Sequence, residues 1–373
     1  MKTFDVAVIG AGPVGSFTAY QLTDRGFKVC LLEKKKEIGK AVICAGVISK
    51  QAFKRFDLPT ESVLGRFNTI VFVSPKGRRL IYESEENFAY VVDRKIFDRG
   101  ISTMAQRIGV EIHCGEKVTE IEESTHNYTI KTKSKRFRAK VVVLATGVNY
   151  GLHRKCSLGQ PEDYLYGSQV DTHLFVPEER IIIHIGQNFA PGSFGWIVPA
   201  GLGNTRIGVL TYDRNRRWLN KFLKNRLNIS DKNIKNRLRL KPIAYGPIDR
   251  SVKNRVLAVG EAAGQIKTTT GGGIFYGLLC SEIAVDKIAK YFKSKHRLTD
   301  YELTWRTALK SEFDIGKSLR EIARTLDDDT IEKLFAFVKK NRVWVRYLLP
   351  RINFDFHSNF LFFCLQSFKS LLF

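Results

Sequence analysis

Six residues near the start of the chain have the spacing of a phosphate-binding turn. The segment Phe4–Ile9 is a short apolar run rich in β-branched residues, as in a buried parallel strand. Gly10–Gly15, with the sequence GAGPVG, follows this strand and opens a helix that we expect over Ser16–Arg25. A glycine-rich junction lets the backbone approach a bulky anion, and a helix N-terminus favours its negative charge. This spacing predicts the binding of a dinucleotide pyrophosphate.

An acid completes this unit at the end of the next expected strand. Lys28–Leu32 is apolar, and Glu33 follows it 18 residues after Gly15, where a carboxylate can accept hydrogen bonds from ribose hydroxyls. Gly10 allows a tight turn, Gly12 lets the backbone reach the pyrophosphate, and Gly15 lets the helix pack closely on the strand. The alternative is a glycine-rich turn that binds nothing. The cofactor contacts expected from this unit are Gly10, Gly12, Pro13, Gly15, Glu33 and Lys34.

A second junction of the same kind lies in Val256–Leu279. Its sequence, VLAVGEAAGQIKTTTGGGIFYGLL, reads as an apolar strand, a Gly-acid-Ala-Ala-Gly turn and three glycines that open an apolar helix. The acid in the turn can hydrogen-bond a polyol hydroxyl, and the helix N-terminus favours negative charge. We expect the two junctions to bind one cofactor together. The contacts expected here are Gly260, Glu261, Gly264, Gly271, Gly272, Gly273 and Ile274.

Two side chains between the junctions could act beside a bound cofactor. Cys44 lies among small residues in the loop Gly39–Ser49, which would let a flat ring lie close; an inert loop cysteine is the alternative. Arg94 lies in the first turn of a helix expected to run to Ile108, where the helix dipole disfavours a cation. Contact of Arg94 with a flavin or a phosphate would explain this placement, and so would a surface ion pair with Asp98.

The elements between the junctions must bring these residues together, and their patterns indicate an α/β fold with α+β elements. Val63–Tyr82 alternates as a strand hairpin around the turn Pro75–Gly77, and further antiparallel strands run to Ser134. Lys140–Ala145 is a buried strand that ends on a turn of small residues, where another group must pack closely. These elements extend the opening unit into a Rossmann-type domain.

A different sequence pattern follows the first part of the Rossmann-type domain. Leu165–Asp213 holds apolar runs divided by Gly, Pro and Asn turns with no helical period, which predicts an inserted antiparallel sheet. Arg214–Leu240 reads as basic helices, and the chain reads as helical from Tyr301 to its end. The last 17 residues, His357–Phe373, are rich in Phe and Leu. They fit either a helix packed on the core or one lying in a membrane interface.

The net charge of the chain indicates which classes of partner it could bind. Its 373 residues carry a net charge of +24, with 14 Lys or Arg against two acids in Arg214–Arg255. Such a balance favours phospholipid head groups, diphosphates or nucleic acid, and a lysine-rich composition without function is the alternative. Arg214–Arg255 offers few aromatic residues for base stacking and no known RNA module, so we expect no nucleic acid.

The six cysteines form no CxxC pair and no spacing suited to zinc or an iron–sulfur cluster, so we expect no metal. Cys30 and Cys280 lie in apolar runs and are expected to be buried thiols, which favours a reducing cytoplasm. The first residues do not have a signal-peptide pattern, and no run is long and apolar enough to span a bilayer.

Together these residues resemble the geranylgeranyl reductase family, flavoproteins with the p-hydroxybenzoate hydroxylase-like fold, and within it the archaeal digeranylgeranylglycerophospholipid reductases. The likeness covers most of the chain to about residue 290. Gly260–Ile274 is similar to the family's GDAAG…TxGGGI signature, and Cys44–Gly46 is similar to its CxG loop. Phe194–Pro199 is similar to its YxWxFP substrate motif, and Asp93–Asp98 to its DRxxFD helix.

The sequence departs from the family pattern at three positions. Glu261 stands where the family has Asp, so its contact with a flavin ribityl chain needs room for one more methylene. Phe194 and Val198 replace the Tyr and Phe of the substrate motif. The expected pocket therefore lacks one hydroxyl and has a wider floor, which bears on the choice of substrate.

The resemblance implies FAD as the cofactor and reduction of isolated C=C bonds in geranylgeranyl chains, with a hydride from flavin N5 and a proton on the other carbon. It implies a discontinuous FAD-binding domain (1–62, 84–160 and 250–295), an inserted antiparallel-sheet substrate domain (63–83 and 161–249) and a helical C-terminal region (296–373). Cys44 is the expected proton donor or modulator of the flavin. The further FAD contacts it implies are Cys44, Ala45, Gly46, Arg94, Val118, Ala145 and Gly147, and the substrate-pocket residues are Phe194, Trp196 and Pro199.

The expected partners follow from this reaction. The substrate is a long-chain isoprenoid lipid or prenyl diphosphate. Electrons come from NAD(P)H docking transiently or from a ferredoxin-like carrier, because only one full dinucleotide fingerprint is present. The basic stretch would attach a cytoplasmic protein to the inner face of an anionic membrane. The alternatives are a flavin monooxygenase of the same fold, and an electron-transfer or binding flavoprotein without alkene reduction.

Overall fold

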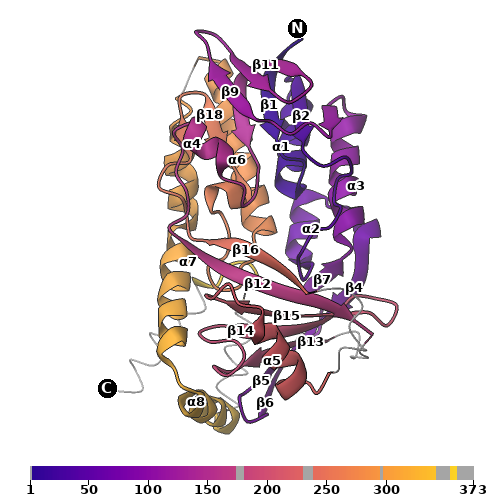
Figure 1. Ribbon diagram of the computed structural model, residues 1–373, viewed down its shortest axis with the longest axis vertical. Helices are drawn as coiled ribbons and strands as arrows, with labels where there is room; N and C mark the ends of the chain where they lie inside the picture. The colour runs from indigo at the N-terminus through magenta and orange to yellow at the C-terminus, as the bar shows by residue number, and fades with distance from the viewer. Residues whose placement is uncertain (1, 174–179, 230–237, 295–296, 342–352, 359–373) are drawn as a thin grey trace.

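The computed structural model describes residues 2–173, 180–229, 238–294, 297–341 and 353–358, which form three β-sheets with helices packed around them (Figure 1). An eight-stranded sheet occupies the upper half of the view, and a seven-stranded sheet crosses the lower half. A three-stranded sheet, in the order β3-β7-β4, consists of β3 (Val47–Ser49), β7 (Ala89–Val92) and β4 (Val63–Phe67).

The eight-stranded sheet contains the opening unit that the sequence predicts. β1 pairs in parallel with β2 on one side and β11 on the other, and β18 pairs in parallel with β11. Both faces of β1 are buried, since Val6 and Val8 belong to one hydrophobic core and Ala7 and Ile9 to another. Its strands are β1 (Thr3–Ile9), β2 (Val29–Glu33), β8 (Glu111–Cys114), β9 (Glu120–Glu123), β10 (Tyr128–Lys131), β11 (Arg136–Leu144), β17 (Val252–Lys253) and β18 (Val256–Ala258).

Helices cover this sheet and join it to the rest of the molecule. α1 packs against α3 and α6, and their buried faces meet in a single hydrophobic core. Asp93 caps α3 as expected, because its carboxylate accepts the backbone N–H groups of Lys95 and Ile96. The helices are α1 (Pro13–Asp24), α2 (Lys50–Phe56), η1 (Thr60–Ser62), α3 (Arg94–Arg107), α4 (Gly151–Lys155), η4 (Gly260–Ala263) and α6 (Ile274–Phe292).

The seven-stranded sheet is mixed, where the sequence predicts an antiparallel one. β13 pairs with β5 in parallel, and the other neighbouring strands pair antiparallel. β5 and β6 form the expected hairpin, but Val63–Phe67 lies in the small sheet, because β4 pairs with β7. The strands are β5 (Thr69–Val73), β6 (Arg79–Glu83), β12 (Asp163–Thr172), β13 (Arg180–Ile185), β14 (Phe194–Pro199), β15 (Thr205–Thr211) and β16 (Arg239–Tyr245).

The expectation of basic helices over Arg214–Leu240 is only partly right. α5 (Arg217–Lys221) and the π-helix η2 (Phe222–Arg226) cover the sheet, whereas Arg239 already begins β16. Residues 230–237 of this stretch lie outside the described residues. β16 is a strand because it completes seven consecutive pairs with β12, a tertiary constraint that the basic local sequence does not reveal.

The C-terminal part is helical through α7 (Asp300–Thr325) and α8 (Asp328–Lys340). The expected helix to the end of the chain is wrong for Asn353–His357, which has no helical structure, and most of the expected terminal helix lies outside the described residues. Cys30 and Cys280 are buried free thiols, as expected. None of the helices among the described residues has the length and apolar character of a membrane span.

Candidate functional site

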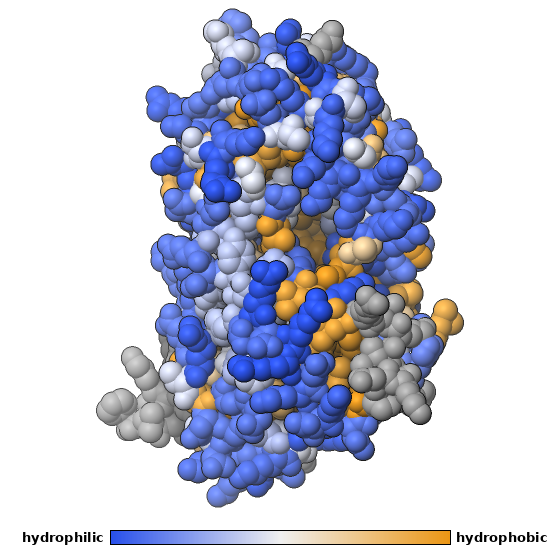
Figure 2. Space-filling model, in the orientation of Figure 1, coloured by the Kyte–Doolittle hydropathy of each residue, from blue (hydrophilic) through white to orange (hydrophobic). Residues whose placement is uncertain are grey.

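A cavity of about 650 Å³ lies where the eight-stranded sheet faces the seven-stranded one. Both glycine-rich junctions line it, together with the end of β11 and the loop before β3. Figure 2 shows the molecule hollowed between its upper and lower halves, with hydrophobic residues in the hollow. Apolar wall residues that the cavity includes are Val42, Val47, Ile48, Ile274 and Phe275.

The first junction has the geometry of a phosphate-binding turn. A Cβ built on Gly15 would lie 1.9 Å from the carbonyl oxygen of Gly10, so the helix touches the turn. A Cβ on Gly12 would meet nothing within 4 Å, and Gly12 lines the cavity. The backbone at Gly12 is thus open to a ligand at the N-terminus of α1.

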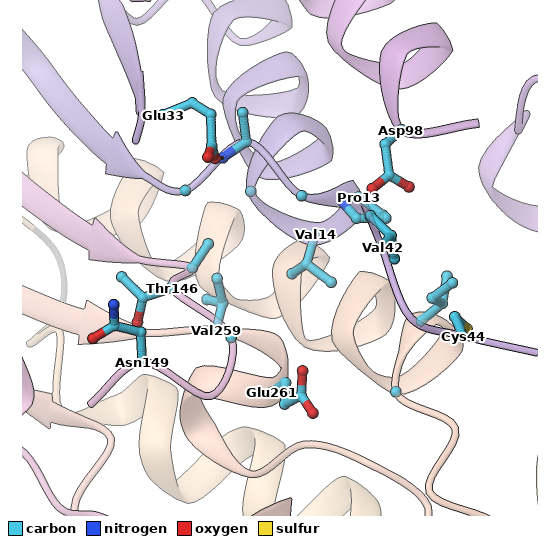
Figure 3. Close-up of a pocket in the computed structure, with 18 of the residues that line it drawn as sticks. Pro13, Val14, Glu33, Val42, Cys44, Asp98, Thr146, Asn149, Val259 and Glu261 are labelled. Atoms are coloured by element: carbon cyan, nitrogen blue, oxygen red, sulfur yellow. Dashed lines mark hydrogen bonds between the residues drawn. The ribbon is translucent and has the colours of Figure 1, made fainter. Parts of the chain in front are cut away.

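Glu33 ends β2 beside this junction, as Figure 3 shows. One carboxylate oxygen accepts the backbone N–H of Ala11 at 2.8 Å, and the other accepts that of Lys35 at 2.9 Å. These bonds fix the carboxylate at the cavity wall and leave further lone pairs for hydroxyl donors. This arrangement fits the ribose of a dinucleotide.

The end of β11 completes the wall between the junctions. A Cβ on Gly10 would lie 2.4 Å from the carbonyl oxygen of Ala145, so the expected close packing at this turn is present. Thr146 lines the cavity, and its buried hydroxyl has no hydrogen-bond partner among the described residues. A ligand hydroxyl or phosphate at this point would supply that partner.

Glu261 faces the cavity from the second junction, across from Glu33 (Figure 3). Its carboxylate accepts a hydrogen bond from the ammonium group of Lys241 at 2.9 Å, and the Tyr150 hydroxyl donates to its carbonyl oxygen at 2.8 Å. Lys241 comes from β16. The ion pair therefore joins the two large sheets at the cavity.

The three glycines before α6 form a tight turn with Lys267. The backbone N–H of Gly271 donates to the Lys267 carbonyl at 2.8 Å, and the Lys267 N–H donates to the Gly272 carbonyl at 2.9 Å. Gly271, Gly272 and Gly273 all line the cavity at the start of a 19-residue helix. The first N–H groups and the dipole of α6 favour negative charge here.

Cys44 and Arg94 meet at the cavity wall. The Cys44 sulfur accepts the Gly46 backbone N–H at 3.3 Å. Burial would raise the pKa of the thiol, but the Arg94 guanidinium, with smaller help from this N–H and from Lys241, lowers it below the ordinary value. The group is thus a stronger acid than a free cysteine.

Arg94 forms the ion pair with Asp98, but not at the surface. Its Nε lies 2.8 Å and its Nη2 3.0 Å from the two carboxylate oxygens, and the two side chains are only 15% and 3% exposed. Both residues line the cavity. Burial opposes the charge of Arg94, but Asp98 and Cys44 outweigh it and raise the pKa of the guanidinium. A fixed cation therefore stands beside the Cys44 sulfur.

Arg206 reaches this loop from β15. Its Nη1 donates to the carbonyl oxygens of Ala45 at 2.9 Å and Val92 at 3.0 Å, and a Cβ on Gly46 would collide with it. Arg206 thus holds the loop after Cys44 against β7.

The predicted site residues divide into two groups. Most of the expected cofactor contacts line this one cavity, whereas Ala45, Gly46, Gly260 and Gly264 are not among its wall residues. Those that line it are Gly10, Gly12, Pro13, Gly15, Glu33, Lys34, Cys44, Arg94, Val118, Ala145, Gly147, Glu261, Gly271, Gly272, Gly273 and Ile274. Phe194, Trp196 and Pro199 lie on β14 outside its wall, and the substrate pocket they were expected to form stays a prediction.

Several wall residues have no counterpart in the sequence expectations. Lys241 enters the sequence expectations only as one charge of the basic stretch, and Lys267 has no role in them. Asp355 and Phe354 come from a part of the chain with no motif. The described residues hold no group of three His, Cys, Asp or Glu suited to a metal ion.

Sequence comparison identifies relatives of the whole chain. Residues 7–186 match the family described as pyridine nucleotide-disulphide oxidoreductase. The chain is 30% identical over 364 residues to digeranylgeranylglycerophospholipid reductase 1 of Methanococcoides burtonii, covering 90% of this chain and 88% of that protein. It is 28% identical over 359 residues to the digeranylgeranylglycerophospholipid reductase of Methanocaldococcus jannaschii, covering 89% of each.

Two solved structures share the fold. A geranylgeranyl bacteriochlorophyll reductase-like protein from Thermoplasma acidophilum has a TM-score of 0.83 at 22% identity, over 91% of this chain and 92% of that one. The p-nitrophenol 4-monooxygenase of Pseudomonas putida has a TM-score of 0.74 at 17% identity, over 94% and 98%. The predicted α/β fold of p-hydroxybenzoate hydroxylase-like flavoproteins is confirmed, and with it an FAD-binding domain.

Proposed function

This chain belongs to the digeranylgeranylglycerophospholipid reductase family, and on that premise we propose that it hydrogenates isolated C=C bonds of geranylgeranyl chains as an FAD-dependent oxidoreductase. The observation that carries the proposal is a single cavity on which both glycine junctions, Glu33, Glu261 and Cys44 converge. The open backbone at Gly12 and the buried hydroxyl of Thr146, which has no partner among the residues that the structure describes, fit an elongated, polar and anionic cofactor such as FAD.

Bound FAD supplies the hydride chemistry, and the chain supplies binding, orientation and charge. Gly12 and the N-terminus of α1 would hold the pyrophosphate, Glu33 the ribose, and Glu261 the polyol chain. The N-terminus of α6 favours negative charge at the Gly271–Gly273 end of the cavity.

An isolated alkene is a poor hydride acceptor, so a proton must reach the second carbon. Cys44 supports this step in the proposal, because its thiol lines the cavity and has a lowered pKa. Arg94 would stabilise the negative charge left on the sulfur, since Asp98 holds its guanidinium in place. The proton thus leaves the Cys44 sulfur.

The substrate is proposed to be a long isoprenoid chain with a phosphate-bearing head, as phospholipid or diphosphate. Phe194, Trp196 and Pro199 would contact it from β14, where the Trp196 indole N–H is buried with no hydrogen-bond partner in the described part of the chain. Residues 63–83 and 161–249, which contain the seven-stranded sheet, are accordingly proposed as the substrate domain, and the remaining segments as the FAD-binding and C-terminal parts.

Electrons reach the site either from NAD(P)H or from a ferredoxin-like carrier. Attachment to the inner face of an anionic membrane is proposed as well, because a substrate lipid resides there and the chain has a net charge of +24.

Anaerobic turnover tests the function directly. The FAD-loaded protein is reduced with dithionite and incubated with geranylgeranyl phospholipids and diphosphates, and mass spectrometry counts added hydrogen pairs. We expect products heavier by whole hydrogen pairs and reoxidation of the flavin. A product that forms only with oxygen and carries an added hydroxyl would instead support the monooxygenase of the same fold.

A further inference from the structure

A short segment from the C-terminal part of the chain forms part of the cavity wall. Asn353–Ser358 has no motif and no helical structure before its last residue. Two of its residues, Phe354 and Asp355, line the cavity together with Lys267 and the glycines before α6. The wall at this end thus comes from two segments far apart in the sequence.

A buried ion pair joins the two segments. The Lys267 ammonium donates to the Asp355 carboxylate at 2.7 Å and to the Phe354 carbonyl at 2.8 Å. The two charged side chains are only 8% and 2% exposed. Lys267 also exchanges backbone hydrogen bonds with Gly271 and Gly272, so the pair lies next to the glycines that precede α6.

Other contacts hold the segment independently of this pair. Glu312 on α7 accepts the backbone N–H of His357 at 2.8 Å, that of Ser358 at 3.1 Å, and the Ser358 hydroxyl. The Tyr276 hydroxyl of α6 donates to the Asp355 carbonyl at 2.9 Å. Asp355 is therefore placed by the fold and does not depend on Lys267 alone.

One carboxylate oxygen of Asp355 lacks a partner. Oδ1 accepts from Lys267, but Oδ2 is buried and finds no hydrogen-bond donor in the described part of the chain. A buried carboxylate oxygen normally has a donor, because burial removes its hydration. Since Asp355 lines the cavity, a ligand N–H group at this point would satisfy it.

We propose that Lys267 and Asp355 form a positioning pair for the flavin ring, in which Asp355 Oδ2 accepts a ring N–H and each charge of the pair offsets the effect of the other on the reduction potential. This inference rests on the proposed function, and it adds that the flavin ring lies at the Gly271–Gly273 end of the cavity. Reduction adds negative charge to the ring, which the cation of Lys267 stabilises and the anion of Asp355 destabilises. The folded chain holds both charges next to each other, so their effects nearly cancel.

Two single substitutions separate the charges. Lys267→Met leaves the buried anion alone and should lower the flavin potential, and Asp355→Asn leaves the cation alone and should raise it. We expect each shift to correspond to about a tenfold change in the ratio of the FAD dissociation constants of the oxidised and reduced forms, or about 30 mV for a two-electron couple. The potential is measured by anaerobic equilibration of the FAD-loaded protein against a reference dye.

Two further variants control for disturbed structure. The double variant Lys267→Met/Asp355→Asn removes both charges and should return the potential close to the unmodified value. Ser358→Ala loosens the same segment without a change of charge and should leave the potential unchanged. If Asp355→Asn does not fold, the double variant should still have a higher potential than Lys267→Met.

Shifts of the same sign in both single variants, or no shift in either, would overturn the proposal, because a structural role alone has no reason to change sign with charge. The result is distinguishable from failure of the proposed function. If the unmodified chain binds FAD and reduces geranylgeranyl chains while the variants keep its potential, only the pair's role is wrong. If the unmodified chain binds no FAD, the proposed function is wrong.

Discussion

Burial and charge act in opposite directions on Cys44. The buried sulfur would be a weaker acid than a free thiol, but Arg94, Lys241 and the Gly46 N–H together reverse this and lower its pKa. Neither cation is a neighbour of Cys44 in the sequence. The same side chain would be inert in a loop that lacked the Arg94–Asp98 pair.

Cys44→Ala should therefore slow alkene reduction while FAD stays bound. Because positioned general acids contribute about 10²–10⁴-fold, we expect a loss of that order in the single-turnover rate of dithionite-reduced protein. Cys114→Ala, at an exposed cysteine outside the cavity wall, is the control. An unchanged rate in Cys44→Ala would rule out the proton-donor role.

The pH dependence of the alkene-reduction rate tests the role of Cys44 independently. A thiol with a lowered pKa loses its proton at lower pH than a free cysteine, for which the pKa is about 8.5. A step that needs the protonated thiol should therefore slow as pH rises, beginning below the range of a free cysteine. This slowing should be absent in Cys44→Ala; its persistence would assign it to another group.

Gly12 and Gly15 should respond differently to the same added methyl group. Gly15→Ala places a Cβ 1.9 Å from the Gly10 carbonyl and should cost about 1–3 kcal/mol or more in stability, as overpacking does. Gly12→Ala has room in the protein and should keep its melting temperature, but its methyl group would point into the pyrophosphate site. We expect at least tenfold weaker FAD binding by Gly12→Ala in equilibrium titration. Unchanged FAD affinity would place the pyrophosphate elsewhere.

Short elements position the second junction from behind. α4 contributes His153, whose Nε2 lies 2.9 Å from the carbonyl oxygen of Ala262 in η4, and Tyr150 just before α4 donates to Glu261. On the other side, Arg320 of α7 donates to the carbonyl of Thr268 at 2.8 Å. The loop from Glu261 to the glycines is thus held in place by α4 and α7, two helices that are separate from it in the sequence.

The burial of His153 on α4 should make the fold sensitive to acid. Burial lowers the pKa of His153 from 6.5 to about 4, so the unfolded chain binds this proton more tightly than the folded chain. The contribution of the neutral His153 side chain to the free energy of unfolding is intact above pH 6.5. It is lost progressively as pH falls toward 4, by roughly 3 kcal/mol at most. His153→Gln cannot titrate and should lose less melting temperature over this window.

His184 serves as the matched comparison for this experiment. Its pKa is also lowered to about 4, by burial first and then by Arg226 and Arg79, but it lies in the seven-stranded sheet away from η4. His184→Gln should remove a similar part of the acid sensitivity. If neither variant changes the pH dependence of melting, these histidines are not the groups that take up protons on unfolding.

The charge of the whole molecule is uneven. Half of the net excess lies in Arg214–Arg255, and α5 and η2 within this stretch lie over the seven-stranded sheet (Figure 1). The exposed bases there are Arg214, Arg216, Arg217, Lys221 and Lys224. An anionic membrane would meet several of these charges at once, each worth about 1 kcal/mol near such a surface.

Neutralising part of this surface should weaken membrane binding. The triple variant Arg216→Gln/Lys221→Gln/Lys224→Gln should bind anionic vesicles on the order of 100-fold less well at low salt, measured by co-sedimentation. The control Lys133→Gln/Arg136→Gln/Arg138→Gln makes the same charge change around β11 and should bind normally. Equal losses in both variants would mean that net charge matters and this surface does not; no binding by the unmodified chain would remove the membrane prediction.

The local features of this protein can be predicted from its sequence alone. The two glycine junctions, Glu33 at the end of β2 and the Asp93 cap of α3 are each specified by residues within a few positions, because turn geometry and capping depend on the nearby backbone. Both buried thiols and the flavoprotein fold followed from these patterns. The pairing of β16 with β12 and of β13 with β5 did not, since strand partners are chosen by packing across the whole molecule. Three contacts at the cavity are visible only in the tertiary structure: Lys241 with Glu261, Arg206 with the loop of Cys44, and Lys267 with Asp355. Each joins two segments far apart in the sequence, and whether such segments meet depends on how every element between them packs.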